Sequence, residues 1–263
     1  MNFEELLKTA INATIKGGHV IMDLYTSNFT VEQKEDNSPL TLADKNCNAI
    51  IEADLEETNI PILSEEGENK SFSERKNWEY LWLVDPLDGT KEFIKRNGEF
   101  TVNIALIHHG SPVMGVIYAP VKEELYFALE GMGSYKTSRD SIIRNLEELI
   151  LNSNKLPISV KRDSYIIVNS RSHMSEKTEQ FFKEKKNEHS EVEVVEVGSS
   201  LKLCMVAEGK ADAYPRYAST MEWDTAAGHA IAKFAGFSVK QYNSSDDVGY
   251  NKEDLLNPWF LVK

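Results

Sequence analysis

The sequence predicts a mixed α/β (α+β) protein, because three patterns follow one another along its 263 residues. A long amphipathic helix comes first, a meander of apolar strands fills the rest of the first half, and strands alternate with helices in the second half. A chain of this length can bury a sizeable core. We expect one compact unit of two subdomains, 1–140 and 141–263, with their boundary in the weakly patterned region 136–160.

Two helices are expected to open the first half. Apolar residues spaced three and four apart predict the first over 3–25, although Gly17-Gly18 interrupts the pattern and would allow close packing. Thr41, followed by Asp44 three positions later, is close to a capping box. It therefore predicts a second helix that runs through Leu55.

Short apolar runs bounded by turn residues predict the strands. In the first half they favour an antiparallel sheet, with strands at 60–63, 80–84, 102–107, 113–118 and 125–129. A short helix is expected at 146–151. After it, strands at 165–168, 192–197, 211–214 and 259–262 alternate with helices at 176–186, 201–207 and 225–235.

The composition favours a soluble, cytoplasmic enzyme. The formal net charge of −13 argues against binding to nucleic-acid polymers, which depends on cation contacts to phosphates. Cys47 and Cys204 are expected to be reduced and buried. The sequence shows no signal peptide and no apolar run near the roughly 18 residues that span a bilayer. Peripheral association with the inner face of a membrane stays open, as does the choice between a monomer and a homodimer.

Acidic residues at the ends of predicted elements are the strongest functional signal. Asp85 follows the buried strand 80–84, and Asp88 comes three positions later. Two carboxylates this close suit a pair of hard divalent cations, which prefer oxygen ligands. The alternative is an Asp-rich surface turn.

The backbone around these carboxylates adds a second signal. We expect Pro86 to stop the strand and fix a turn, and the carbonyl oxygen of Leu87 to offer a further oxygen ligand. Gly89 permits unusual backbone angles. A helix that begins near Thr90 would leave N–H groups for an anion.

Two more acidic sites lie elsewhere in the chain. Glu65-Glu66 follows strand 60–63, and Asp224 stands at the start of a helix of small residues. Each has a simpler alternative, a solvated turn for the first and a plain N-cap for the second. Three acidic sites at element ends are harder to explain as coincidence, so together they predict a metal centre.

Two motifs, Asp85-Pro86-Leu87-Asp88-Gly89-Thr90 and Trp223-Asp224-Thr225-Ala226-Ala227-Gly228, resemble in sequence and order the signatures of the inositol monophosphatase superfamily. The likeness runs over essentially the whole chain. Further stretches resemble bacterial CysQ-type 3′(2′),5′-bisphosphate nucleotidases of that superfamily: 82–103, 170–173, 198–202, 214–216 and 256–258. The chain departs from the family pattern in 136–160 and at Met221-Glu222.

The resemblance implies a layered αβαβα sandwich of the sugar-phosphatase type. It would have an antiparallel N-terminal sheet, a smaller mixed C-terminal sheet, and a metal site where the two halves meet. The implied cofactor is Mg²⁺, as two or more ions. The implied ligands are Glu65 (rather than Glu66), Asp85, the Leu87 carbonyl, Asp88 and Asp224.

The resemblance also assigns catalytic roles. Asp44 and Thr90 would orient and deprotonate the attacking water, with Glu65 as the third catalytic residue. The backbone of Asp88, Gly89 and Thr90 would hold the scissile phosphate. The substrate-binding residues implied in this way are Glu65, Leu87, Asp88, Gly89, Thr90, His173, Ser199, Lys202, Arg216 and Asp224.

The implied reaction converts adenosine 3′,5′-bisphosphate to AMP and phosphate by in-line attack of a metal-activated water, in the context of sulfur metabolism. The sulfated 3′-phosphoadenylyl sulfate is a second candidate substrate. Lys202 and Arg216 would bind the second phosphate, unless they form ordinary surface salt bridges. His173 is either near the nucleoside or a loop histidine. Ser199 and Ser200 begin a predicted helix, so one of them is either a ligand or only the N-cap of that helix. An inositol-phosphate or sugar-phosphate phosphatase and a non-catalytic nucleotide-binding protein are the alternatives.

Overall fold

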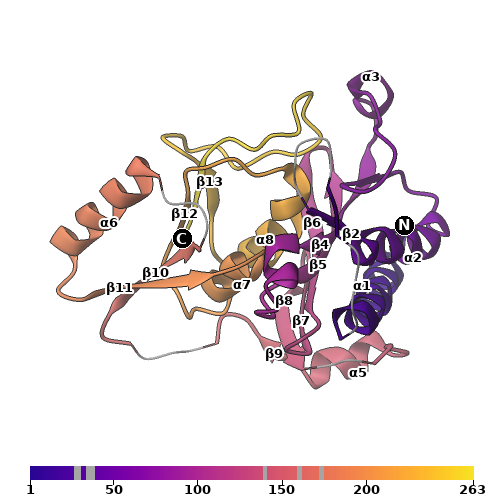
Figure 1. Cartoon of the computed structure of the whole chain (residues 1–263), viewed down its shortest axis with the longest axis horizontal. Helices are drawn as coiled ribbons and strands as arrows, with labels where there is room; N and C mark the ends of the chain where they lie inside the picture. The colour runs from indigo at the N-terminus through magenta and orange to yellow at the C-terminus, as the bar shows by residue number, and fades with distance from the viewer. Residues whose placement is uncertain (27–30, 34–38, 139–140, 159–161, 172–174) are drawn as a thin grey trace.

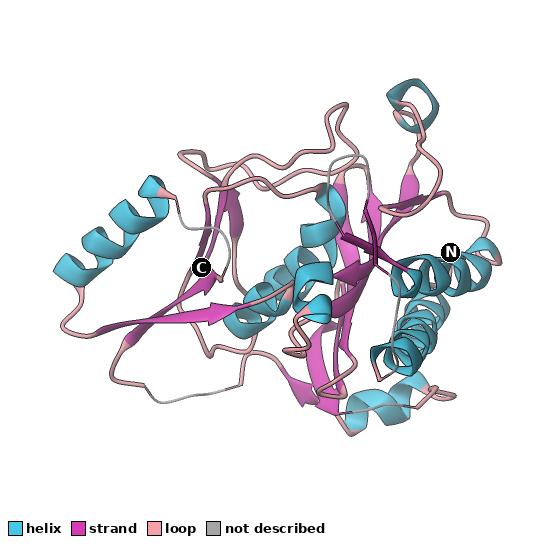
Figure 2. Cartoon of the chain, viewed as in Figure 1, coloured by secondary structure: helices cyan, strands magenta, loops and turns pink. Residues whose placement is uncertain are grey.

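The structure is a computed structural model that describes residues 1–26, 31–33, 39–138, 141–158, 162–171 and 175–263, with the backbone alone for 31–33 and 39–41. Its elements stack in five layers, as Figures 1 and 2 show. Two helices cover one face of a large sheet, two more cover the other face, and a smaller set of strands and an outer helix complete the stack. The layered αβαβα arrangement expected from the family resemblance is confirmed.

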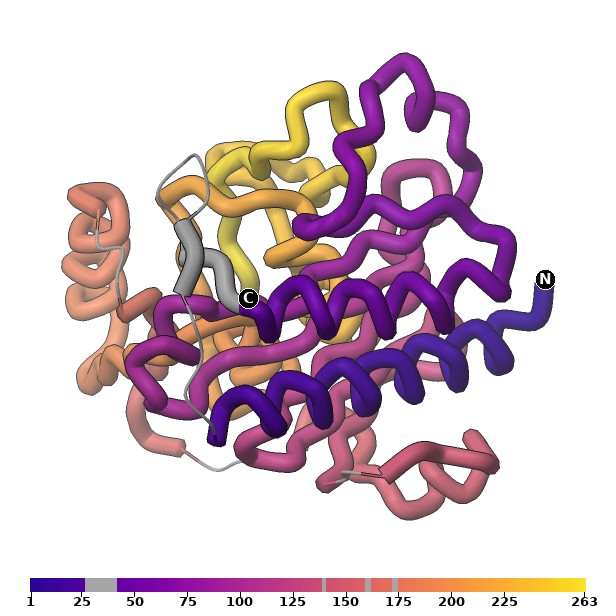
Figure 3. Tube along the Cα trace, turned by 45° about the vertical axis from the view of Figure 1, so that its right-hand side comes forward, coloured from indigo at the N-terminus to yellow at the C-terminus, as the bar shows by residue number. Residues whose placement is uncertain are grey.

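The first layer pairs α1 (Phe3–Tyr25) with α2 (Leu42–Glu56), which run side by side in Figure 3. Asn2 caps α1 by accepting a hydrogen bond from the Glu5 N–H at 3.3 Å. Gly17 does not break the helix. A Cβ atom there would lie 2.6 Å from the Cys47 sulfur, so the glycine permits the close approach of α2.

The large sheet has the strand order β3-β4-β5-β6-β7-β8-β9. Only the β3–β4 pair is parallel, and every other neighbouring pair is antiparallel. The strands are β3 (Ile62–Ser64), β4 (Tyr80–Asp88), β5 (Thr101–His108), β6 (Ser111–Ala119), β7 (Glu124–Leu129), β8 (Gly133–Ser138) and β9 (Asn154–Lys155). The last two lie in the region that carried little sequence pattern, where β8 and β9 bracket α5 (Leu146–Leu151).

The expectation that Pro86 stops its strand is wrong. Strand β4 continues through Pro86, and the ladder passes from the pair Asp85–Asn103 directly to Asp88–Thr101. Three steps along β4 therefore match two along β5, which is a β-bulge. Because a bulge frees one residue from pairing, it accommodates a proline that has no N–H to donate.

The helices of the third layer are α7 (Leu201–Ala207) and α8 (Glu222–Phe234), which pack on the second face of the large sheet. Helix α8 begins three residues earlier than the sequence pattern predicts. Asp224 is consequently not its N-cap but its third residue, where its Oδ2 accepts a hydrogen bond from the Met221 N–H at 2.9 Å. This carboxylate stabilises the helix start from inside the first turn.

The fourth and fifth layers belong to the second half. Strands β10 (Tyr165–Ser170) and β11 (Val192–Val197) are parallel, while β12 (Tyr214–Arg216), β14 (Phe260–Val262) and β13 (Val239–Gln241) form an antiparallel group. A parallel bridge from Ile167 to Ala213 joins the two groups into the expected mixed arrangement. Helix α6 (Glu176–Glu188) packs outside them.

Three apolar clusters separate the layers. Both cysteines are buried and free, as predicted. The shorter elements are β1 (Val31–Gln33), β2 (Pro39–Thr41), α3 (Phe72–Arg75) and α4 (Thr90–Ile94). Among the described helices, none combines the length and the apolar character that a bilayer span requires. The boundary between 1–140 and 141–263 stays a prediction.

Candidate active site

A pocket opens where the end of β4 meets the first residues of α4, α7 and α8, so both halves of the chain contribute to it. Most residues singled out in the sequence line it. They are Glu65, Asp85, Leu87, Asp88, Gly89, Thr90, Ser199, Lys202, Arg216 and Asp224. His173 lies outside the described residues.

Three carboxylates form the centre of one wall. Glu65, Asp85 and Asp224 each offer an oxygen, and these oxygens all lie within 4.8 Å of one another. They come from the end of β3, from β4 and from α8, which explains how positions so distant in sequence converge. Glu65, rather than Glu66, is the member of its pair that joins the group.

The carboxylates destabilise one another's charges. Burial raises the pKa of Asp85, and the neighbouring charges of Glu65, Asp88 and Asp224 raise it further. The pKa of Asp224 rises to about 8, again through lost hydration first and neighbouring carboxylates second. A divalent cation would remove this repulsion, and carboxylate oxygens are the donors that such hard cations prefer. The donor set therefore fits a metal centre.

The bulge in β4 fixes the direction of Asp85. Its side chain is 1% exposed, and Oδ1 accepts a hydrogen bond from the Leu87 N–H at 3.1 Å. The Leu87 carbonyl oxygen in turn accepts from the Thr90 hydroxyl at 3.3 Å. Asp85 and Leu87 are two positions apart on this irregular strand, and both line the pocket.

Asp88 is held by residues that no sequence motif singled out. Its Oδ2 accepts hydrogen bonds from the Ser200 hydroxyl at 2.6 Å and from the Asn103 amide at 3.3 Å. The Ser200 hydroxyl also lies 2.8 Å from the Asp224 carbonyl oxygen. It accepts a hydrogen bond from the Asn103 amide at 2.9 Å. Ser200 therefore joins the two acidic motifs. Both residues fall inside stretches that resemble the nucleotidases, and Ser200 also stands at the start of a predicted helix, but neither signal predicts a contact with Asp88.

Gly89 and Thr90 lie where β4 passes into α4. Gly89 has φ = 94°, a backbone conformation that a side chain disfavours, and a Cβ there would also lie 3.1 Å from the Glu99 carbonyl oxygen. Thr90 is the first residue of the short helix α4, as expected. The first N–H groups of a helix have no partner within it, so they are available at this point of the pocket.

Asp44 is placed differently from the other predicted catalytic residues. It lies in the first turn of α2, is 3% exposed, and is not among the residues that line the pocket. Its charge nevertheless acts on Asp85, whose pKa it helps to raise, and on the thiol of Cys47. Asp44 is thus an electrostatic neighbour of the centre, and its role toward water stays a prediction.

A second part of the pocket lining, the basic wall, carries two cations. Lys202 and Arg216 are both buried to 7% exposure, from α7 and β12 respectively. Lost hydration lowers the pKa of Lys202 to about 8, with Arg216 as a further cause. Arg216 donates from Nη2 to the Ser219 carbonyl oxygen at 2.7 Å, but its Nε is buried with no hydrogen-bond partner among the described residues.

Ser199 connects this wall to α7. It has φ = 48°, and its carbonyl oxygen accepts a hydrogen bond from the Lys202 ammonium. Ser200, not Ser199, is the N-cap of α7. A buried donor without a partner costs about 1–3 kcal/mol, so a bound hydrogen-bond acceptor beside the Arg216 Nε would be favourable.

Comparison with known proteins decides the family. The model of the inositol monophosphatase family matches residues 2–259 of the chain. The chain belongs to the inositol monophosphatase family. It is 43% identical to the 3′(2′),5′-bisphosphate nucleotidase CysQ of Shigella flexneri over 251 residues, which cover 93% of this chain and 94% of that protein.

Solved structures agree with this family assignment. The crystal structure of CysQ from Bacteroides thetaiotaomicron, described as a bacterial member of the family, has a TM-score of 0.92 and 51% identity, covering 99% of this chain and 97% of that one. An inositol monophosphatase from Thermotoga maritima has the same fold, with a TM-score of 0.72 at 22% identity over 98% and 92% of the two chains. The expectation that this chain is a phosphatase of the family is confirmed.

Proposed function

We propose that this protein is a Mg²⁺-dependent 3′(2′),5′-bisphosphate nucleotidase that hydrolyses the 3′-phosphate of adenosine 3′,5′-bisphosphate to give AMP and phosphate. The observation that carries the proposal is the pairing of two walls in one pocket. A carboxylate cluster suits the metals that receive the scissile phosphate, and a buried Lys202–Arg216 pair suits a second phosphate. Inositol 1-phosphate has no second phosphate for that pair.

The metal-holding residues in this proposal are Glu65, Asp85, Asp88, Asp224 and the carbonyl of Leu87. Bound Mg²⁺ would supply charge neutralisation for the phosphate oxygens and acidify water in the pocket. The carboxylates of this wall cannot bind the phosphate themselves, because like charges repel. Their part is to hold the cations in fixed positions.

The remaining steps belong to the chain's own groups. The N–H groups of Gly89 and Thr90 would donate to the phosphate, and the Thr90 hydroxyl, now 3.3 Å from the Leu87 oxygen, would turn to orient the attacking water. Asp44 would take up the proton that this water loses. The water oxygen then bonds to phosphorus in line with the breaking P–O3′ bond. The departing 3′-oxygen takes up a proton from solvent water and becomes the 3′-hydroxyl of AMP, and Asp44 returns its proton to solvent.

The 5′ side of the substrate would face the basic wall. Arg216 would use its free Nε and Lys202 its ammonium to bind the 5′-phosphate. The same wall suits 3′-phosphoadenylyl sulfate, which carries a 3′-phosphate for hydrolysis and negative charge on its 5′ group. We include it as a second substrate.

Phosphate release in the presence of Mg²⁺ tests the proposal. Adenosine 3′,5′-bisphosphate should give the highest kcat/KM, adenosine 3′-monophosphate a lower value, and inositol 1-phosphate the lowest. A preference for inositol 1-phosphate would reject the assigned substrate while keeping a phosphatase. A covalent phosphoenzyme, trapped by rapid quench, would reject direct attack by water.

A further inference from the structure

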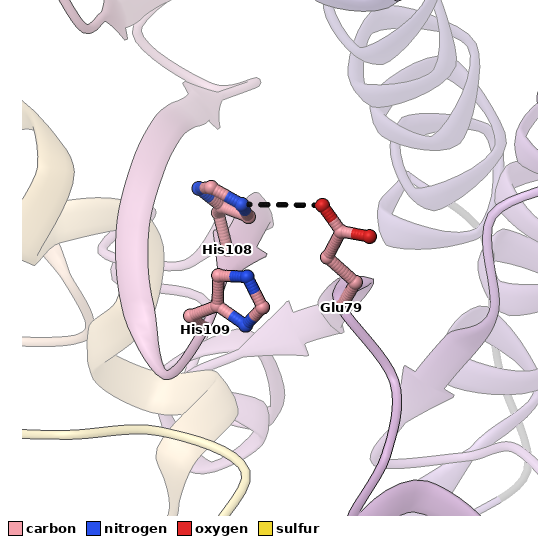
Figure 4. Close-up of side chains that lie close together, drawn as sticks. All are labelled: Glu79, His108 and His109. Atoms are coloured by element: carbon pink, nitrogen blue, oxygen red, sulfur yellow. Dashed lines mark ion pairs between the residues drawn. The ribbon is translucent and has the colours of Figure 1, made fainter.

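A second group of metal-ligating side chains lies at the other end of β4. Glu79 directly precedes this strand, His108 ends β5, and His109 begins the turn to β6. One ligand atom from each lies within 4.8 Å of the others, and Figure 4 shows the three side chains facing one another. Five residues of β4 separate Glu79 from Asp85. The six steps between them, at about 3.3 Å each, place this group about 20 Å from the carboxylate cluster.

The turn explains why both histidines reach the same place. Consecutive side chains of a strand point to opposite faces. Here His109 and Gly110 have φ = 47° and 77°, and the pairing of His108 with Ser111 closes a two-residue hairpin of the type that needs positive φ at both positions. The reversal brings the two imidazole rings to a centroid distance of 4.4 Å.

The backbone of the group is held in place without any ion. The His109 N–H donates to the Glu79 carbonyl oxygen at 3.0 Å, and the Gly110 carbonyl oxygen accepts from the Tyr250 N–H at 3.0 Å. The His108 ring stacks on Tyr80 at 4.2 Å and 7°. His108 and His109 are thus held in place by contacts within the protein, before any metal binds.

We propose that Glu79, His108 and His109 form a binding site for a transition-metal cation, with Zn²⁺ as the ion that suits it best. Two imidazole nitrogens and one carboxylate oxygen are typical zinc donors, whereas Mg²⁺ prefers oxygen ligands alone. Water would complete the coordination. This site is chemically distinct from the carboxylate centre and does not depend on the proposed function.

Small side-chain movements suffice for binding. Zinc bonds of about 2.0–2.1 Å in a tetrahedral site place ligand atoms about 3.3 Å apart. The Glu79 oxygen and the His108 Nε2 are 3.6 Å apart already, which is also the spacing of a His–Glu ion pair. The Glu79 side chain is 63% exposed, so it can rotate toward the ion without repacking the core.

Zinc titration of untagged protein in saturating Mg²⁺, followed by calorimetry, tests the proposal. We expect one Zn²⁺ per chain that persists in Asp85→Asn. Glu79→Gln and His109→Asn should each weaken binding at least tenfold, because even indirect partners of a metal contribute about 10–100-fold. Asparagine is chosen since it tolerates positive φ. His189→Asn, at an exposed histidine stacked on Tyr165, should change nothing.

Three outcomes would overturn the proposal. They are the absence of saturable Zn²⁺ binding, binding that Asp85→Asn abolishes, and binding that both Glu79→Gln and His109→Asn leave unchanged. The second would place the ion in the carboxylate centre, and the first would leave His108 and Glu79 as an ordinary ion pair. Circular dichroism of each variant confirms that a loss of binding is not a loss of fold.

Discussion

The two walls of the pocket differ in how their charges are held. The acidic wall takes its carboxylates from strand ends and one helix turn, and those carboxylates repel one another, as the raised pKa values of Asp85 and Asp224 record. The basic wall has two buried cations, and the Nε of one of them, Arg216, has no hydrogen-bond partner within the described part of the chain. The nearby carboxylates Asp88 and Asp224 favour the charge of Lys202, but burial still lowers its pKa. Each wall therefore suits a ligand of opposite charge, and separate experiments can address each.

The largest expected effect comes from breaking the acidic wall. Asp85→Asn keeps an oxygen for the Leu87 N–H but removes the central negative charge, so the fold should survive while kcat/KM falls about 10²–10³-fold or more. Steady-state phosphate release with Mg²⁺ measures it. Glu68→Gln, an exposed residue outside the pocket, is the matched control. Activity near that of the wild type would remove Asp85 from the centre.

Breaking the basic wall should affect one substrate and spare another. A hydrogen bond to a charged group contributes about 1.5–3 kcal/mol, so Arg216→Gln should raise KM for adenosine 3′,5′-bisphosphate about 10–100-fold. KM for adenosine 3′-monophosphate, which lacks the 5′-phosphate, should hardly change. Lys183→Gln on the exposed face of α6 serves as the control. Equal losses for both substrates would mean that Arg216 supports the pocket rather than the second phosphate.

A substitution of Ser200 tests its hydrogen bond to Asp88. Ser200→Ala removes the 2.6 Å hydrogen bond to Asp88 without adding bulk. Because Asp88 is predicted to hold metal, the apparent Mg²⁺ affinity should fall about 10–100-fold, as is usual for residues that orient a ligand. The activity at saturating Mg²⁺ should largely recover. No change in the Mg²⁺ dependence, measured also by magnesium titration calorimetry, would contradict this role.

The last expected effect concerns stability against pH rather than catalysis. The folded-state pKa of Asp224 is raised to about 8, so without metal this group favours the folded state at low pH and loses that contribution as pH rises from about 4 to 8. The loss amounts to at most about 1.4 kcal/mol of unfolding free energy per pH unit. Urea unfolding in EDTA should show a shallower pH dependence for Asp224→Asn, while Mg²⁺ should stabilise only the wild type. Identical pH profiles would contradict the raised pKa.

Local patterns predicted much of the fold. The helix over 3–25 and the helix at 146–151 match the structure residue for residue, because capping and apolar spacing are short-range signals. The bulge at Pro86 and the start of α8 were missed, since the pairing partner decides the first and a side-chain hydrogen bond from Asp224 decides the second. The last two strands of the sheet, β8 and the edge strand β9, carry little apolar alternation, and the sequence pattern does not predict them for that reason.

The site residues also fall into two groups, those that a local motif predicts and those that depend on distant contacts. The carboxylates stand in compact motifs, so residues near 65, 85 and 224 could be identified before their convergence was known. Asn103 and Ser200 act through a contact between positions 97 residues apart. The family resemblance implies Arg216 as a ligand but not its burial. Neither a distant contact nor burial of a cation has a local signature in a single sequence.

The hydroxyl of Ser200 has one hydrogen and two acceptors within reach, Asp88 Oδ2 and the Asp224 carbonyl oxygen. It can donate to only one of them at a time. If a cation draws the Asp88 carboxylate away, the hydrogen can rotate to the carbonyl, and no buried donor is left without a partner. The Ser200 hydroxyl would then stay paired when the centre is loaded, which would spare metal entry a desolvation penalty of about 1–3 kcal/mol for that group.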